Sequence, residues 1–209
     1  MLGLLHRLDE KQIMANVAAP VLHELAARVR GVVQLGTFEN DMVTYRIKTG
    51  RGANVLFTRV GMQLEAYYSG IGKVLLAYLP EAERELYLAG GPFVSLTERP
   101  LVDPARLRNE LEIVRGQGFA IDDEETAPGL RCMAVPLCRS DGKVLAAISV
   151  SQAVSSRHRL PDAPFLALLT EAGQAIERQA LEQSKLAERQ AVHAPAGDPF
   201  LGAHDRARR

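Results

Sequence analysis

The residues best suited to chemistry lie in one stretch near the middle of the chain. Four consecutive acids, Asp122-Asp123-Glu124-Glu125, follow a short apolar segment, and a Pro-Gly bend separates them from Cys132. Carboxylates accept hydrogen bonds or act as general bases, and a cysteine can act as a nucleophile. Because Asp and Glu are rarely buried without a partner, a solvated turn explains this run as simply as the wall of a ligand pocket does.

Two hydroxyl groups occur further along, in the apolar run 144–151. Ser149 and Ser151 are two residues apart, so on a β-strand their side chains point to the same face. Paired hydroxyls on one face of a central strand could bind a polar ligand. Alternatively, each could form a local bond to the backbone.

The glycine-rich segment 69–73 marks a strand-to-helix junction, with Ser69 as the expected N-cap. Its Gly-Lys pair invites comparison with a phosphate-binding loop. That motif needs a glycine five residues before its second glycine and a Ser or Thr after the lysine. Tyr67 and Val74 occupy those positions, which excludes the motif. Two interpretations remain: exposed amides that bind a small anion at the helix start, or close packing of the helix on a sheet.

A catalytic or metal site would need partners for these groups. The chain has five histidines, which fall in expected helices, a loop and the C-terminal tail: His6, His23, His158, His193 and His204. None lies in the strands that carry Cys132 or the serines. Zinc needs closely spaced Cys or His ligands, and too much strand separates Cys132 from Cys138. We therefore expect a binding protein, not an enzyme, with no metal and no cofactor.

Length and composition set the broad class. The chain has 209 residues, 47% of them apolar and 24% charged, which suits one globular domain with appended helices. Its formal net charge is zero, whereas a DNA-binding domain usually has a basic face. The sequence shows no apolar run of membrane-spanning length and no secretory signal, and its two cysteines suit a reducing compartment. These features predict a cytoplasmic protein without a membrane partner.

The pattern of apolar residues predicts the elements that position these groups. Residues 2–18 and 21–30 show helical spacing on either side of Pro20, which predicts two consecutive helices. β-Branched and aromatic runs predict a hairpin over 32–38 and 42–47. Further strands are expected over 53–60 and 64–68, so the sheet should be antiparallel.

Helices and strands alternate in the second half of the chain. The next helices are expected to begin at Ser69, Pro80 and Asp103. Strands flank the Pro-Gly bend, and a tight turn leads into another strand over 144–151. A long final helix covers 164–190, and its second half has few residues to bury. Residues 191–209 are rich in Pro, Gly and charge and are expected to be disordered.

Four segments together resemble one known family. They are GIGK at 70–73, GFAIDDEE at 118–125, PGLRCMAVP at 128–136 and ISVS at 148–151. In this order they resemble the effector-binding domain of IclR-family bacterial transcriptional regulators, from about Val17 to Val154 and more loosely through the last helix. The spacing between the acidic run and the Gly-Leu-Arg-Cys segment is the most specific feature.

This resemblance implies an α+β fold like that of GAF sensory domains. A central, mostly antiparallel sheet is flanked by helices, with an N-terminal connector helix and a long C-terminal helix. The chain would comprise the connector helix (1–18), an effector-binding domain (19–190) and the tail (191–209). The resemblance also implies a small organic or aromatic acid as effector and self-association into a dimer or tetramer. Operator DNA would be bound only through a DNA-binding domain that is not in this sequence and should precede Met1.

The family motifs also imply which residues bind the ligand. The polar candidates are Gly70 and Ile71 at the helix start, with Asp122, Cys132, Ser149 and Ser151, while Ala53 and Leu56 form the apolar side. The family commonly has a histidine just before its Ser/Thr-Gly segment, where this chain has Tyr67. An aromatic residue there would either fill the pocket or stack on a flat ligand. Two alternatives stay open: a small GAF-like enzyme that uses Cys132 and the acids 122–125, and a dimerisation domain without a ligand.

Overall fold

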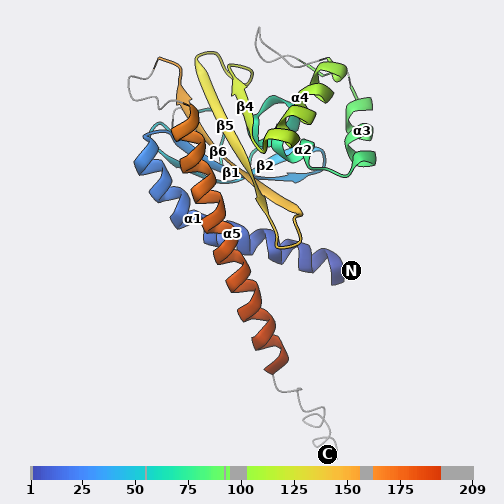
Figure 1. The fold of residues 1–209 in the computed structure, drawn as a ribbon, viewed down its shortest axis with the longest axis vertical. Coiled ribbons are helices and arrows are strands. Elements are labelled where there is room, and N and C mark those ends of the chain that lie inside the picture. Colours follow the sequence, from blue (N-terminus) through green and yellow to red (C-terminus); the bar gives the residue numbers. More distant parts are fainter. Residues whose placement is uncertain (1, 55, 92, 95–102, 156–161, 194–209) are drawn as a thin grey trace, which may run out of the picture.

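The centre of the fold is one six-stranded antiparallel sheet with the strand order β3-β2-β1-β6-β5-β4 (Figure 1). This computed structural model describes residues 2–54, 56–91, 93–94, 103–155 and 162–193. The strands are β1 (Val32–Glu39), β2 (Met42–Gly50), β3 (Gln63–Glu65), β4 (Ala120–Asp123), β5 (Leu130–Cys138) and β6 (Val144–Ala153). The pairing of β1 with β6 joins the two halves of the sheet in its middle.

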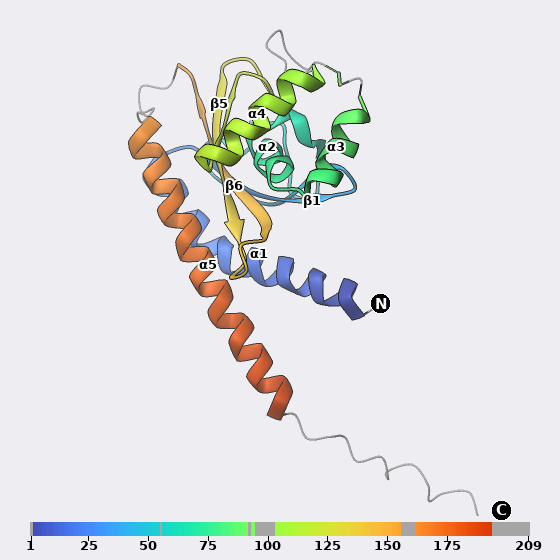
Figure 2. The ribbon, with the colours of Figure 1, turned by 45° about the vertical axis from the view of Figure 1, so that its right-hand side comes forward.

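Helices cover both faces of this sheet, as the turned view in Figure 2 shows. One face packs against α1 (Leu2–Val29) and α5 (Asp162–His193). The other face packs against the short 3-10 helix η1 (Ala66–Tyr68), α2 (Gly70–Ala77) and α4 (Pro104–Gln117), with α3 (Glu81–Ala89) beside α4. The predicted α+β class, with a mostly antiparallel sheet flanked by helices, is confirmed.

Alternating side chains along β6 divide the interior into two cores. Ile148 and Val150 pack with α1 and α5, while Ala147 belongs to the core beneath α2. Ser149 and Ser151 therefore face α2, since neighbouring strand residues point to opposite faces. Both serines are buried. The prediction that they share one face is confirmed, and that face is the one covered by the glycine-rich helix.

The helix ends follow the capping residues in the sequence. Ser69 caps α2, and its Oγ accepts a hydrogen bond from the amide of Gly72 at 3.1 Å. Asp103 caps α4 by accepting from the amide of Ala105 at 2.7 Å. Gly118 ends α4 with φ 83°, a conformation that suits glycine. The predicted helix starts at Ser69 and Asp103 are confirmed.

The two predicted N-terminal helices form one helix, α1, with Pro20 inside it. A proline in a helix interior removes one backbone hydrogen bond and costs about 3 kcal/mol. Pro20 is on the exposed side, whereas Val17, Leu22 and Leu25 on either side of it are buried in the same core. Continuous packing on the sheet outweighs the local cost. The predicted division between connector and domain, after residue 18, falls inside this helix and stays a prediction.

The predicted third strand over 53–60 is wrong. The described residues of 51–61 form turns and a loop, and the strand that pairs with β2 is β3. Gly50 and Gly52 have φ of 104° and 87°, so the chain turns away at the end of β2. The run expected over 64–68 is divided between β3 and η1. Turn geometry therefore outweighs the strand propensity of the residues that follow it.

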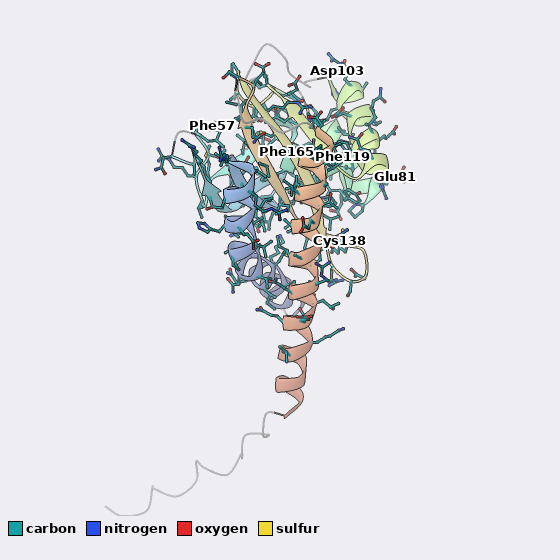
Figure 3. All side chains as sticks on the ribbon, turned by 60° about the vertical axis from the view of Figure 1, so that its left-hand side comes forward. Phe57, Glu81, Asp103, Phe119, Cys138 and Phe165 are labelled. Atoms are coloured by element: carbon teal, nitrogen blue, oxygen red, sulfur yellow. The ribbon has the colours of Figure 1, made fainter. Side chains whose placement is uncertain are left out.

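The final helix extends beyond the sheet. Phe165 and Ile176 are buried against the sheet, whereas Leu181 and Leu186 are exposed on the second half. Figure 3 shows Phe165 on the part of α5 beside the sheet, with the rest of the helix projecting past it. The helix reaches His193, so the predicted tail begins within it, and residues 194–209 lie outside the described residues. No helix in the described ranges is long and apolar enough to span a bilayer.

Candidate effector pocket

Most of the residues predicted from the family motifs meet in one small cavity between α2 and the sheet. Those that line it are Leu56, Gly70, Ile71, Asp122, Cys132, Ser149 and Ser151. In the sheet, Cys132 lies opposite Ser151 and Ala134 lies opposite Ser149. The amides of Gly70 and Ile71 belong to the first turn of α2, and the first amides of a helix have no acceptor within that helix. Polar groups from four elements, α2, β4, β5 and β6, are thus brought together beside apolar side chains.

Two predicted residues lie elsewhere. Ala53 sits in the turn that replaces the predicted strand and does not line this cavity. Tyr67 points from η1 into a second cavity, where its hydroxyl accepts from the amide of Val94 at 2.9 Å and donates to the carbonyl of Val94 at 3.2 Å. The 3-10 turn after β3 sends this ring away from the sheet centre. Neither residue lines the cavity beside α2, because the chain is not extended over 53–60 and 64–68 as the prediction assumed.

Other lining residues were missed at the sequence level. Gln34 and Tyr45 are buried on β1 and β2 and line the cavity, and Gln34 is paired with Ser149 in the sheet. A signal was available for Gln34, because it is a polar residue between Val33 and Leu35 in an apolar strand. Nothing in the local sequence distinguishes Tyr45 from an ordinary core tyrosine.

Asp122 is the most deeply buried acid at the site, with 1% of its surface exposed. Its Oδ1 accepts from the amides of Glu125 at 2.9 Å and Thr126 at 3.2 Å. The Thr126 hydroxyl lies 2.6 Å from the carbonyl oxygen of Tyr68 and also contacts Oδ2 of Asp122. A hydroxyl has one proton, so both contacts are hydrogen bonds at once only if Oδ2 carries a proton itself. Burial acts in the same direction and raises the pKa of Asp122.

We expect Asp122→Asn to flatten the dependence of stability on pH. A carboxyl whose pKa is raised on folding binds more protons in the native state, so stability falls as pH rises from about 4 toward the raised pKa. Asparagine keeps an acceptor for both amides and donates to Thr126 without titrating. The variant should match the wild type at pH 4, within about 1 kcal/mol, and be at least as stable at pH 7. Urea unfolding from pH 4 to pH 8 measures this.

The difference in unfolding free energy between Asp122→Asn and wild type is compared at the two pH values. A variant that loses more stability against wild type at pH 7 than at pH 4 would contradict the prediction. That result would mean that Asp122 is ionised and that its charge stabilises the fold. Glu125 also has a raised pKa, caused chiefly by burial, so some pH dependence should persist in the variant. Asp103→Asn, at the exposed cap of α4, provides a control for a substitution that leaves the buried site intact.

Cys132 has the environment of an unreactive thiol. Its Sγ lies 3.0 Å from Oγ of Ser151, and burial, with the nearby Asp122, raises the pKa of the thiol far above its ordinary range. A neutral, buried thiol is a poor nucleophile. Within the described part of the chain, no group of three or more His, Cys, Asp or Glu side chains is placed to hold a metal ion.

A buried lysine explains the acidic run. Lys73 of α2 has no exposed surface, and its Nζ donates to Oε1 of Glu125 at 2.8 Å, to the carbonyl of Ile121, and to Oε1 of Glu110 at 3.3 Å. The remaining acids hold the bend: Glu124 accepts from the amide of Gly129 at 2.7 Å. Asp122 therefore lines the cavity, while Glu125 balances the charge of Lys73 on α2. The acidic run is neither a simple solvated turn nor wholly a pocket wall.

The cavity itself is small. Its volume is about 20 Å³, enough for about one water molecule. Leu56, Phe57 and Thr58 from the loop 51–61 cover it. Lys48 holds this loop by donating to the carbonyls of Leu56 at 2.7 Å and of Thr58, and Gln34 donates to the Thr58 hydroxyl at 2.8 Å. A ligand larger than water therefore requires movement of this loop.

Comparison with known families agrees with this geometry. The family model described as bacterial transcriptional regulator IclR C-terminal matches residues 6–178. The chain belongs to the IclR family. It is 35% identical over 158 residues to the transcriptional regulator XynR of Escherichia coli, an alignment that covers 75% of this chain and 63% of XynR. It is 34% identical over 131 residues to KdgR of the same organism, covering 62% of this chain and 50% of KdgR.

Solved IclR-family structures share the fold. The C-terminal domain of E. coli KdgR superposes with a TM-score of 0.70 at 29% identity, covering 80% of this chain and 98% of that domain. An IclR homologue from Microbacterium hydrocarbonoxydans, solved in complex with 4-hydroxybenzoate, gives a TM-score of 0.73 at 27% identity, covering 82% of this chain and 70% of that protein. The relatives are transcriptional regulators, so the expectation that the chain is not an enzyme is confirmed. The alternative of a small GAF-like enzyme is set aside.

Proposed function

We propose that this chain is the effector-binding and oligomerisation domain of a cytoplasmic IclR-type regulator, and that the cavity beside α2 binds a small organic or aromatic acid. The observation that carries this proposal is the meeting of Ser149, Ser151 and Asp122 with the first turn of α2 in one buried place. The complex of the Microbacterium relative with 4-hydroxybenzoate supports an aromatic acid as the class of ligand.

The groups around the cavity suit an anionic ligand. Amides at a helix start, here those of Gly70 and Ile71, stabilise a carboxylate. The serines supply hydroxyl donors, and a protonated Asp122, whose proton is held by Thr126, does not repel the anion. Leu56 and Phe57 provide apolar contact for an aliphatic chain or a ring. The ligand enters by displacing the loop 51–61, so binding changes the conformation of the segment next to β2.

Signal output then depends on parts beyond the pocket. We propose that α1 connects this domain to a DNA-binding domain that is absent from this sequence and contacts the operator. The projecting half of α5, with Leu181 and Leu186 exposed, offers apolar surface for a second copy of the chain. A dimer or tetramer would present two or more such DNA-binding domains together. Light scattering of the isolated chain tests this association, and a monomer at micromolar concentration would contradict it.

Effector binding is tested with a thermal-shift screen of aliphatic and aromatic carboxylic acids that includes 4-hydroxybenzoate. At least one acid should raise the melting temperature, and Ser149→Ala and Ser151→Ala should each weaken its binding about tenfold through the loss of a hydrogen bond. Ser155→Ala, at an exposed hydroxyl just beyond β6, is the matched control and should bind like the wild type. If no acid stabilises the fold, or if both variants bind normally, this pocket is not an effector site and the ligand-free dimerisation domain becomes the better explanation.

A further inference from the structure

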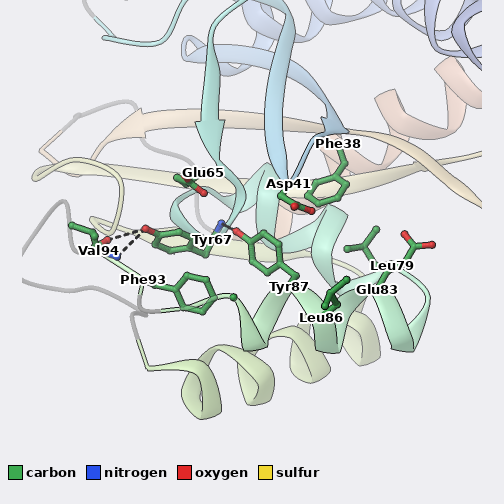
Figure 4. A pocket seen from close by; sticks show the side chains of 11 residues that line it. Phe38, Asp41, Glu65, Tyr67, Leu79, Glu83, Leu86, Tyr87, Phe93 and Val94 are labelled. Atoms are coloured by element: carbon green, nitrogen blue, oxygen red, sulfur yellow. Dashed lines mark hydrogen bonds between the residues drawn. The ribbon is translucent and has the colours of Figure 1, made fainter.

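A second and much larger cavity lies near the tip of the β1–β2 hairpin, between that hairpin, η1 and α3 (Figure 4). Its volume is about 390 Å³, within the range of cavities that bind small organic molecules. It shares no lining residue with the effector pocket. The proposed function makes no use of this space.

Aromatic rings form the inner wall of this second cavity. The ring centroids of Tyr67 and Phe93 are 4.6 Å apart, and those of Tyr87 and Phe93 are 5.7 Å apart with an angle of 20° between the planes. Phe38 meets the edge of Tyr87 at 6.3 Å. Backbone contacts hold two of the rings, because Val94 pairs with the Tyr67 hydroxyl and the Tyr87 hydroxyl accepts from the amide of Tyr67 at 3.3 Å. The wall is therefore preorganised.

The charged groups around this wall are all acidic. Asp41, Glu65 and Glu83 line the cavity, and no Lys, Arg or His is among its described lining residues. Within the described part of the chain, none of the three carboxylates forms an ion pair. Figure 4 shows Glu65 and Asp41 on the hairpin side of the rings and Glu83 on the α3 side. Burial raises the pKa of Tyr87, and the charges of Glu65 and Asp41 add to this effect, which places both carboxylates within electrostatic reach of the wall.

We propose that this cavity is a second ligand site, and that it takes a small organic cation with an apolar body, such as an arylalkylamine. Its ammonium group would lie near the carboxylates of Asp41 and Glu65, and its apolar body would lie against the aromatic wall. A cation is attracted both by carboxylates and by the faces of aromatic rings. A carboxylic acid is repelled by the same groups. The two cavities thus select ligands of opposite charge, and the second site does not depend on an acid binding in the first.

The test uses calorimetric titration of the chain with 2-phenylethylamine at neutral pH. The neutral 2-phenylethanol and the anionic 3-phenylpropanoate are the matched probes. The amine should bind at least about tenfold more tightly than the alcohol, because only the charged group gains from the carboxylates. The double variant Asp41→Asn/Glu65→Gln should lose at least about tenfold in affinity for the amine. Both acids are exposed, so the fold should be retained, and circular dichroism verifies this.

Glu182→Gln, an exposed acid on the projecting half of α5, serves as the control and should bind the amine like the wild type. Equal affinity for the amine and the alcohol would overturn the proposal, as would unchanged binding by the double variant. Displacement of the amine by an acid that binds the effector pocket would also overturn it, because the two sites would then be one. Amine binding without any acid binding would support this site while contradicting the proposed effector function, so the two failures are distinguishable.

Discussion

Replacing Lys73 with methionine is expected to destabilise the folded chain by about 3–5 kcal/mol, the cost of removing one partner from a buried ion pair. The lysine is fully buried and holds Glu125 at 2.8 Å, and it also satisfies the carbonyl of Ile121. Methionine fills similar space without donating a hydrogen bond. The Glu125 carboxylate and the Ile121 carbonyl would then lose their donor in a largely buried region. Urea unfolding at pH 7 measures the loss.

Three further measurements make this result specific to the ion pair. Lys143→Met, at an exposed lysine in the β5–β6 turn, should change stability by less than about 0.5 kcal/mol. Adding Glu125→Gln to Lys73→Met should recover part of the loss, because the orphaned charge is removed. Lowering the pH should also reduce the difference in unfolding free energy between Lys73→Met and wild type, because Glu125 in the variant is then protonated. A Lys73→Met protein within about 1 kcal/mol of wild type would show that the network contributes little.

Gly72→Ala should prevent normal folding of the chain or cost more than about 3 kcal/mol. A Cβ at this position would lie 1.8 Å from the carbonyl oxygen of Ala66 and 2.5 Å from its carbonyl carbon. These are backbone atoms of η1, so no side-chain rotation can relieve the overlap. The substitution would separate α2 from η1 and displace the Ser69 cap that the Gly72 amide holds at 3.1 Å. Soluble yield and the urea unfolding midpoint are the measurements.

Gly116→Ala is the matched control for that experiment. Gly116 lies inside α4, and a Cβ there would meet no atom within 4 Å. Alanine is the better helix former, so this variant should be stabilised by about 0.5–1 kcal/mol. The same chemical change thus has opposite signs at two helical positions. A Gly72→Ala protein with normal stability would mean that α2 and η1 can move apart without cost.

Local patterns in the sequence were enough to predict most elements and much of the pocket. The two-residue period along β6 placed Ser149 and Ser151 on one face, and Ser69 and Asp103 marked helix starts. Such signals work because capping and alternation depend on neighbours within a few residues. The family motifs then identified Asp122 and Cys132 as neighbours of those serines, and both line the same cavity.

Errors arose where distant packing outweighed local preference. Pro20 suggests a helix break, yet buried residues on both sides of it keep α1 continuous. The residues of 53–60 favour a strand, but the turn at Gly50 and Gly52 directs them over the cavity instead. That path leaves Ala53 outside the cavity beside α2, and the turn into η1 does the same for Tyr67. In α1 several buried side chains outweigh the local cost of the proline, and after β2 the turn at the two glycines outweighs a strand propensity of about 1 kcal/mol.

The acidic run at 122–125 shows most directly which features the sequence determines and which only the tertiary structure determines. By itself the sequence determined that four acids follow a strand and precede a Pro-Gly bend, and it left open a solvated turn or the wall of a pocket. Only the fold decided between these, by bringing Lys73 from 52 residues away to Glu125 and leaving Asp122 beside the serines. The physical reason is that a buried charge needs an opposite charge. Chain topology, not sequence distance, supplies it.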